Sequence, residues 1–202
     1  MKYDEIQIVK YNIEVNIEYG IIKGNNDVFL IKTGLNGNIY GYENKYIKMA
    51  RKINDTLGAS VIVSSSLYNI NEENLLEADM NYIKSKFDVD EIYAFGFSKG
   101  AYILLSYAHK YKEIKRVMGV NPPLMYNLHI IIEGIRKFNK ESLFLIATSL
   151  DPTYKYLDLV KEIKNKKMKI IELKNIDHEF SGYIDEFISL PFKYMIDKNK
   201  EV

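Results

Sequence analysis

The pentapeptide GFSKG, residues 96–100, has the spacing that can turn a serine into a nucleophile. It follows a short apolar run and precedes an apolar segment with helical spacing, which predicts a strand, a tight turn and a helix. Glycines on both sides of Ser98 allow the strained turn that exposes a reactive hydroxyl and aims helix N–H groups at it. An ordinary loop can contain the same pentapeptide, with a serine that merely caps the helix. The motif alone leaves both interpretations open.

Three further candidate elements stand directly after apolar runs that predict strands. They are Thr33-Gly34, Asp151 and His178. In open α/β sheets, ligands bind at the carboxyl ends of the strands, so we expect these residues and Ser98 to lie along one edge. The order of serine, acid and histidine favours catalysis over capping. On its own, Asp151 before Pro152 is also typical of a helix cap.

The composition is that of an ordinary globular protein. The chain has 202 residues, 47% hydrophobic and 27% charged, and the formal net charge is +1. This length predicts a single domain with a substantial core, and the balanced charge excludes a global basic field for nucleic acid. Because the sequence contains no cysteine, disulfides, cysteine nucleophiles and thiolate metal sites are excluded.

The N-terminal residues 1–10 are charged and alternating, without the basic and apolar segments of a signal peptide. No apolar stretch reaches the length that spans a bilayer. We therefore expect a cytoplasmic protein that does not enter membranes.

Hydrophobic periodicity predicts alternating strands and helices after an N-terminal hairpin. Residues 5–23 alternate apolar and polar side chains, which indicates an antiparallel hairpin with one wet face. Strands are predicted at 28–31, 60–63, 92–95, 117–120, 143–147 and 168–173, and helices at 43–57, 71–87, 99–111, 125–138, 154–165 and 181–196. Pro191 is expected to interrupt or kink the last helix. This alternation predicts an α/β fold with a mainly parallel sheet and helices on both faces.

These ordered parts resemble the α/β-hydrolase superfamily, and the resemblance covers nearly the whole chain. It implies that residues 1–202 form one domain without a large cap. The matching segments are Thr33-Gly34-Leu35, GFSKG, Leu150-Asp151-Pro152 and Asp177-His178. The resemblance implies that Ser98 is the nucleophile, His178 its general base, and Asp151 the acid that orients the imidazole. It also implies an oxyanion hole formed by the backbone N–H groups of Leu35 and Lys99.

Two features set this chain apart from many members of the superfamily. Thr33 stands where many members have a histidine that supports the oxyanion loop, so that support is in question here. Only about 20 residues lie between Val120 and Leu143, which is too short for a helical lid of the usual size. We therefore expect a small, lidless esterase or thioesterase with a shallow site or one short covering helix.

Other side chains near the predicted edge have competing interpretations. The candidates for an acyl or aromatic pocket, which are equally compatible with helix packing, are Tyr68, Met125, Tyr126, Tyr154 and Phe180. Lys99 is interpreted as a solvated lysine, with attraction of an anionic substrate group as the alternative. His109 and His129 follow no final strand and are interpreted as surface or core residues.

The leading functional hypothesis is a serine hydrolase that cleaves a carboxylic ester or thioester of a small soluble substrate through an acyl-enzyme. It needs no metal and no organic cofactor. The alternatives are an acyltransferase or peptidase with the same triad, and a non-catalytic binding or assembly module that retains the fold. The acyl chain, the leaving group and the oligomeric state do not follow from the sequence.

Overall fold

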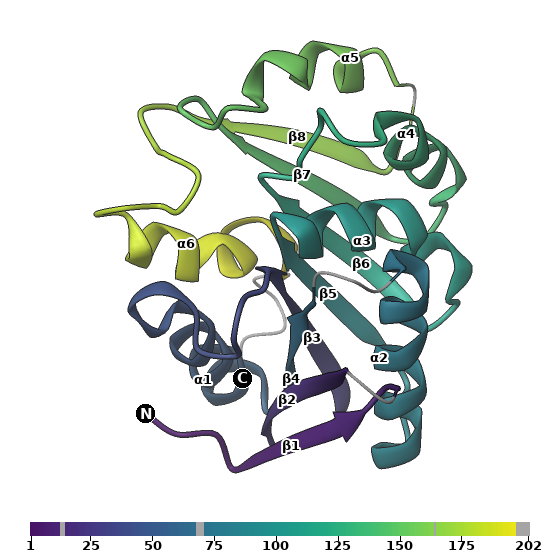
Figure 1. Ribbon diagram of the computed structural model, residues 1–202, viewed down its shortest axis with the longest axis vertical. Coiled ribbons are helices and arrows are strands. Elements are labelled where there is room, and N and C mark those ends of the chain that lie inside the picture. The colour runs from purple at the N-terminus through teal and green to yellow at the C-terminus, as the bar shows by residue number, and fades with distance from the viewer. Residues whose placement is uncertain (13–14, 68–70, 164, 197–202) are drawn as a thin grey trace.

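In the computed structural model, which describes residues 1–12, 15–67, 71–163 and 165–196, an eight-stranded sheet runs through the molecule with helices on both faces (Figure 1). The strand order is β1-β2-β4-β3-β5-β6-β7-β8. The strands are β1 Glu5–Lys10, β2 Asn16–Ile22, β3 Asn25–Leu35, β4 Ala59–Ser66, β5 Ile92–Phe97, β6 Ile114–Val120, β7 Ser142–Thr148 and β8 Met168–Leu173. All pairs from β4 to β8 are parallel, which confirms the predicted fold class.

The N-terminal hairpin is present but differs in its exposed face. β1 pairs antiparallel with β2, and β2 pairs antiparallel with β4. Ile6 and Ile8, whose alternation suggested the covered face, are exposed, whereas Tyr82 donates a hydrogen bond to Gln7 on the opposite face. β1 is the edge strand, and the helix that covers it lies on the side of Gln7. In β1 the two-residue period therefore predicts the strand correctly but not which face is covered, whereas in β2 Ile17 is buried and Asn16 exposed as expected.

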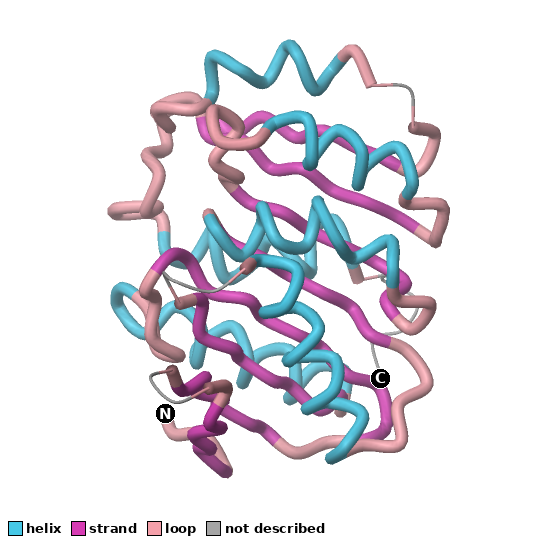
Figure 2. Tube along the Cα trace, turned by 45° about the vertical axis from the view of Figure 1, so that its right-hand side comes forward, coloured by secondary structure: helices cyan, strands magenta, loops and turns pink. Residues whose placement is uncertain are grey.

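Two helical layers enclose the sheet and create two cores (Figures 1 and 2). One layer contains α2 Glu72–Lys86, α3 Lys99–Tyr107, α4 Leu128–Lys137 and α5 Leu157–Lys161, and the other contains α1 Lys45–Leu57 and α6 Ile184–Leu190. Leu76, Leu105 and Ile131 belong to the core beneath the first layer. Ile47 and Phe187 belong to the core beneath the second. Both faces of the central strands are therefore buried, as their continuous apolar runs require.

The last helix changes from α-helical to π-helical geometry at Pro191, the residue predicted to interrupt or kink it. From Pro191 to Met195 the chain forms a π-helical turn, so the proline changes the helix geometry without ending it. α5 is shorter than its predicted helix at both ends, because a 3₁₀ turn, Tyr154–Tyr156, replaces the first turn and the helix ends at Lys161. The segment between β6 and β7 contains a single helix, α4. Among the described residues, no helix is both long and apolar enough to cross a membrane.

Candidate active site

Ser98 occupies a strained turn between β5 and α3. Its backbone has φ 52° and ψ −115°, values that a non-glycine residue rarely adopts. A Cβ at Gly100 would lie 2.2 Å from the carbonyl oxygen of Lys32, and one at Gly96 would lie 2.5 Å from the backbone of Gly100. Both glycines of the motif are therefore required by close packing. The side chain of Ser98 makes no capping hydrogen bond to α3, so the interpretation as a mere helix cap is wrong.

Asp151 and His178 are in contact at the carboxyl ends of β7 and β8. Oδ2 of Asp151 contacts Nδ1 of His178, and Oδ1 accepts hydrogen bonds of 2.6 Å from both the N–H and the hydroxyl of Thr153. The carboxylate is 2% exposed and the imidazole 33% exposed. Burial raises the pKa of Asp151, but the hydrogen bonds from His178 and Thr153 outweigh it and hold the pKa below its ordinary value. The acid therefore remains ionised beside the imidazole and favours a proton on Nδ1.

Ser98 and His178 line one cavity of about 280 Å³, which we call the histidine-side cavity. The ring of Phe97 lies beside the imidazole, with 5.1 Å between ring centroids. Within the described residues, no hydrogen bond joins the Ser98 hydroxyl to His178. The structure thus brings serine, histidine and acid to one edge of the sheet without closing the chain of hydrogen bonds. Catalytic hydrogen bonds are often long without a substrate and tighten when it binds.

The loop that begins at the end of β3, residues 34–37, approaches Ser98 closely. A Cβ at Gly34 would lie 3.5 Å from the Cβ of Ser98, and Leu35, the next residue, lines the same cavity. The N–H of Lys99 belongs to the first turn of α3, where backbone donors have no partner within the helix. The N–H groups expected to form an oxyanion hole therefore belong to two segments that meet beside the serine.

Thr33 supports this loop through two hydrogen bonds. Its hydroxyl accepts from the N–H of Ser66 at 3.0 Å and donates to the carbonyl of Gly37 at 3.0 Å. The N–H of Gly34 donates to the Tyr46 hydroxyl at 3.2 Å. The threonine thus joins the loop to β4. The support that the sequence comparison left in question is present, but a hydroxyl provides it.

Asn121 is a positioning residue that the sequence reasoning missed. It is buried at φ 47°, and its Oδ1 accepts from the N–H and the hydroxyl of Thr148 at 2.9 and 3.1 Å. Its Nδ2 donates to the carbonyl of His178 at 3.1 Å. One side chain therefore connects the ends of β6 and β7 to the loop after β8 that carries His178, which we call the histidine loop. The only sequence signal was an asparagine at a strand end, which is typical of many turns.

A second cavity, of about 450 Å³, meets the first at Ser98. We call it the tyrosine-side cavity, and its lining residues are Leu35, Glu72, Ser98, Lys99, Tyr102, Pro123 and Tyr126. Tyr126 is thus the predicted pocket residue that the structure places here, packed edge-on against Tyr102. Met125 is exposed next to it. Tyr68 lies outside the described residues.

Two predicted pocket residues lie elsewhere. Phe180 is fully buried in the core, with 5.1 Å between its ring centroid and that of Phe187. Tyr154 donates a hydrogen bond to Glu172 on β8. A position in a loop or at a helix start therefore did not identify these two as pocket residues. The ring of Phe180 packs in the core, and the hydroxyl of Tyr154 bonds to a strand side chain.

Lys99 is not the solvated lysine that was expected. Its ammonium donates to the carbonyl of Leu67 at 2.7 Å and lies 3.7 Å from Oε1 of Glu72. Burial lowers the pKa of Lys99, while Glu72 opposes that shift. These partners make Lys99 a poor choice for the group that attracts a substrate anion.

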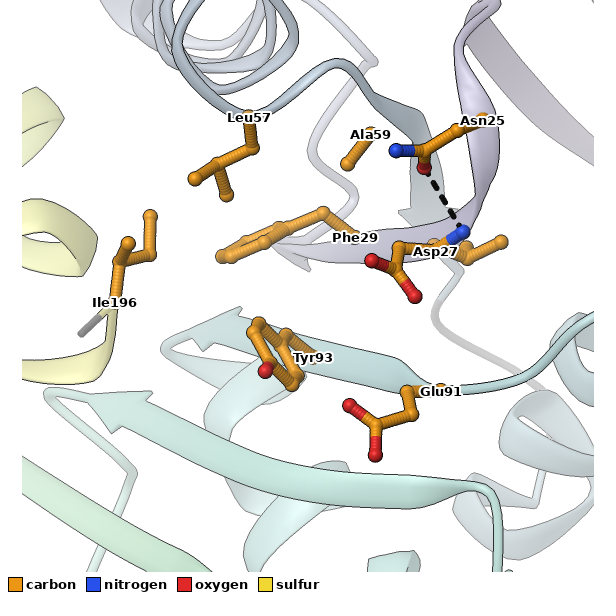
Figure 3. A pocket seen from close by; sticks show the side chains of 9 residues that line it. Asn25, Asp27, Phe29, Leu57, Ala59, Glu91, Tyr93 and Ile196 are labelled. Carbon is orange, nitrogen blue, oxygen red and sulfur yellow. Dashed lines mark hydrogen bonds between the residues drawn. The ribbon is translucent and has the colours of Figure 1, made fainter. Parts of the chain in front are cut away.

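Another cavity, of about 370 Å³, lies at the amino ends of β3, β4 and β5. Phe29 and Tyr93 form its apolar wall with Ile196, and the carboxylates of Asp27 and Glu91 lie at its side (Figure 3). No serine, histidine or lysine is among its described lining residues. It therefore lacks the groups for nucleophilic catalysis. The described chain also contains no group of three His, Cys, Asp or Glu side chains that could hold a metal ion.

The architecture is that of the α/β hydrolases. Est1E from Butyrivibrio proteoclasticus aligns with a TM-score of 0.77 and 11% identity, over 94% of this chain and 97% of that one. XC6422 from Xanthomonas campestris, described as an α/β serine hydrolase without a lid, aligns with a TM-score of 0.68 and 14% identity, over 94% and 93%. The esterase domain of a Rhodothermus marinus protein aligns with a TM-score of 0.68 and 14% identity, over 92% and 94%.

No protein-family model matches the sequence, and no curated protein matches it. At these identities the structural likeness shows the fold, and the chain has the α/β-hydrolase fold.

Proposed function

We propose that this protein is a serine hydrolase that cleaves a carboxylic ester or thioester of a small soluble substrate. The observation that carries the proposal is the strained Ser98 in one cavity with His178, whose ring is held by buried Asp151. Strain of this kind persists only where the surrounding structure enforces it, and it is concentrated at functional sites. The reaction needs no metal and no organic cofactor.

In the first half of the reaction, Ser98 Oγ bonds to the substrate carbonyl carbon and its proton passes to Nε2 of His178. The N–H groups of Leu35 and Lys99 donate to the oxyanion that forms. The bond to the leaving oxygen or sulfur then breaks, and His178 returns the proton to that atom. Asp151 stays ionised and stabilises the imidazolium.

In the second half, water bonds to the carbonyl carbon of the acyl-enzyme while His178 accepts its proton. The bond to Ser98 Oγ then breaks, and the proton passes from His178 to that oxygen. The carboxylic acid leaves and the free enzyme is regenerated. An acyltransferase would use the same residues with another acceptor, which a competition between water and alcohol acceptors detects. A peptidase would use them with an amine leaving group, which turnover of a matched amide detects.

A small soluble substrate is supported by the short connection between β6 and β7. The segment between β6 and β7 contributes only α4, and XC6422 is described as a lidless serine hydrolase. The structurally similar domain from Rhodothermus marinus is described as an esterase domain. Turnover should rise smoothly with the concentration of a soluble short-chain ester. A sharp increase when the substrate forms micelles would instead indicate a mobile lid.

The deciding experiment is labelling with a fluorophosphonate probe, followed by turnover of aryl esters of graded chain length. Ser98→Ala should abolish labelling and lower turnover by roughly three to six orders of magnitude without unfolding the protein. His178→Ala should be nearly as damaging, and Asp151→Asn should cost about 10⁴-fold through the wrong imidazole tautomer.

His109→Ala and His129→Ala are the matched controls, because neither histidine lines a cavity with Ser98 among the described residues. Their turnover should stay close to that of the wild type. A folded wild-type protein that never labels would reject catalysis and favour a binding or assembly module.

A further inference from the structure

The two cavities that meet at Ser98 differ in their relation to His178. The histidine-side cavity is lined by both Ser98 and His178, whereas the imidazole is not among the described residues that line the tyrosine-side cavity. In the proposed reaction, His178 must give its proton to the leaving atom. The leaving group must therefore lie on the side of His178, and the larger tyrosine-side cavity is left for the acyl group.

A buried ammonium borders the histidine-side cavity. Lys45, the first residue of α1, has a side chain that is 1% exposed, and it lines this cavity together with Ser98. Its Nζ lies 3.9 Å from the ring centroid of Phe97 and 4.7 Å from that of Phe187. Aromatic faces attract a cation, but they provide no hydrogen-bond acceptor of ordinary strength.

The ion-pair partner of this ammonium is accessible to solvent. Nζ of Lys45 donates to Oε2 of Glu179 at 3.1 Å, and the Glu179 side chain is 53% exposed. An ammonium has three N–H donors, and Glu179 accounts for one in the described structure. Burial lowers the pKa of Lys45, and Glu179 opposes that shift. An exposed carboxylate loses little when it rotates into water, so another anion can replace it on Lys45.

We propose that the histidine-side cavity is a leaving-group subsite for an alcohol or thiol that carries an anionic group, a carboxylate or a phosphate. The Lys45 ammonium binds that group, and Glu179 is the counter-ion that the substrate displaces. The inference rests on the proposed hydrolase function. It makes Lys45 a specificity-determining residue, distinct from the groups that react.

Matched esters test the charge preference directly. 4-Acetoxybenzoate and 4-acetoxybenzamide share an acetyl group and have leaving groups of similar shape, one anionic and one neutral. The measured quantity is kcat/KM for the anionic ester divided by kcat/KM for the neutral ester. Comparing this ratio between variants cancels the difference in intrinsic reactivity of the two esters. In Lys45→Met this ratio should fall about tenfold or more, because a hydrogen bond to a charged group is lost.

Glu179→Gln should change the same ratio in the opposite direction. The amide no longer competes as an anion for Lys45, so the preference for the anionic ester should increase several-fold. A purely structural ion pair predicts that both variants slow the two esters equally. Lys52→Met, which removes an exposed lysine from the same helix, is the control and should leave the ratio unchanged. The wild-type preference should also weaken as salt is added.

The outcomes separate this inference from the proposed function. Labelling and turnover with an unchanged ratio in both variants would reject the anion subsite and keep the hydrolase. A wild-type preference for 4-acetoxy-N,N,N-trimethylanilinium, a cationic ester, over 4-acetoxybenzamide, lost in Glu179→Gln, would reject it in favour of a cation subsite. Without turnover, calorimetric titration with 4-hydroxybenzoate and 4-hydroxybenzamide still decides whether Lys45 selects the anion. Because Glu179 is exposed, its variant keeps the test available if Lys45→Met fails to fold.

Discussion

Two buried lysines near the candidate site show how differently a charge can be held. Lys32, at the end of β3, is fully buried, and so is its partner Asp79. Its Nζ lies 2.8 Å from Oδ2 of Asp79 and donates to the Ser64 hydroxyl and the Ser65 carbonyl, both at 2.9 Å. The Lys32 ammonium therefore has one ion-pair partner and two hydrogen-bond acceptors, all of them buried, and we call this pair sealed.

Lys45 is equally buried, but its partner Glu179 is half exposed. The contact between Asp151 and His178 has the same form, with a buried carboxylate and a partly exposed imidazole. The comparison shows that the burial of an ion does not by itself indicate a role in function. A buried ion with an accessible partner can exchange that partner for a ligand or a proton, whereas a sealed pair can only hold the scaffold.

The sealed pair should give the largest effect on stability. Asp79→Asn leaves the Lys32 charge without compensation in the core, and we expect a loss of about 3–5 kcal/mol in the free energy of unfolding. Urea denaturation measures the loss. Asp158→Asn, which breaks an exposed pair with Lys161, is the control and should change stability by less than about 0.5 kcal/mol. A loss below about 1 kcal/mol in Asp79→Asn would mean that the pair is not part of the scaffold.

The next effect should come from the hydroxyl of Thr33, the residue that follows Lys32 in β3. Thr33→Val keeps the shape of the side chain but leaves the Ser66 N–H and the Gly37 carbonyl without their partner. We expect a loss of about 2 kcal/mol in stability and a lower kcat, because the loop that supplies the Leu35 N–H is displaced. Thr33→Ser should retain most of both. Equal behaviour of the valine and serine variants would show that the hydroxyl does not support the loop.

A smaller, pH-dependent effect is expected at Asp151. Its pKa is lower in the folded protein than in the unfolded chain, so its carboxylate stabilises the fold above the unfolded value of about 3.9. That contribution is lost as the pH falls through the folded pKa. Asp151→Asn should therefore be less stable than the wild type at pH 7, by about 1–2 kcal/mol, and the gap should narrow below about pH 4. Melting temperatures across this range measure the gap, and a gap independent of pH would contradict the assignment.

The smallest stability effect is expected at the accessible partner of Lys45. Glu179→Gln should change the free energy of unfolding by less than about 1 kcal/mol, since an exposed carboxylate in an ion pair contributes little. Thermal melts of Glu179→Gln and Asp79→Asn, measured under the same conditions, compare the two losses of stability directly. If both variants lost several kcal/mol, the pair of Lys45 and Glu179 would be sealed in solution, and the distinction between the two lysines would disappear.

Local patterns predicted the fold, and the candidate site residues that they identified lie at one edge of the sheet. The strand, turn and helix around Ser98 depend on neighbours within a few residues, because only glycines fit beside β3 and the helix backbone. Continuous apolar runs identified the buried strands, and their order placed Asp151 and His178 at one edge. Periodicity failed where the same spacing suits two outcomes, as with the exposed face of β1 and the buried ring of Phe180.

The sequence by itself thus determined the order of elements, the strained serine and the chain positions of the acid and the histidine. Only the tertiary structure decided which side chains support them. Asn121 joins strand ends to the histidine loop, and Lys45 meets Glu179 from a point 134 residues away. The physical reason is range: backbone strain and periodicity are set by adjacent residues, whereas the burial of a charge and the exposure of its partner depend on segments that meet only after folding.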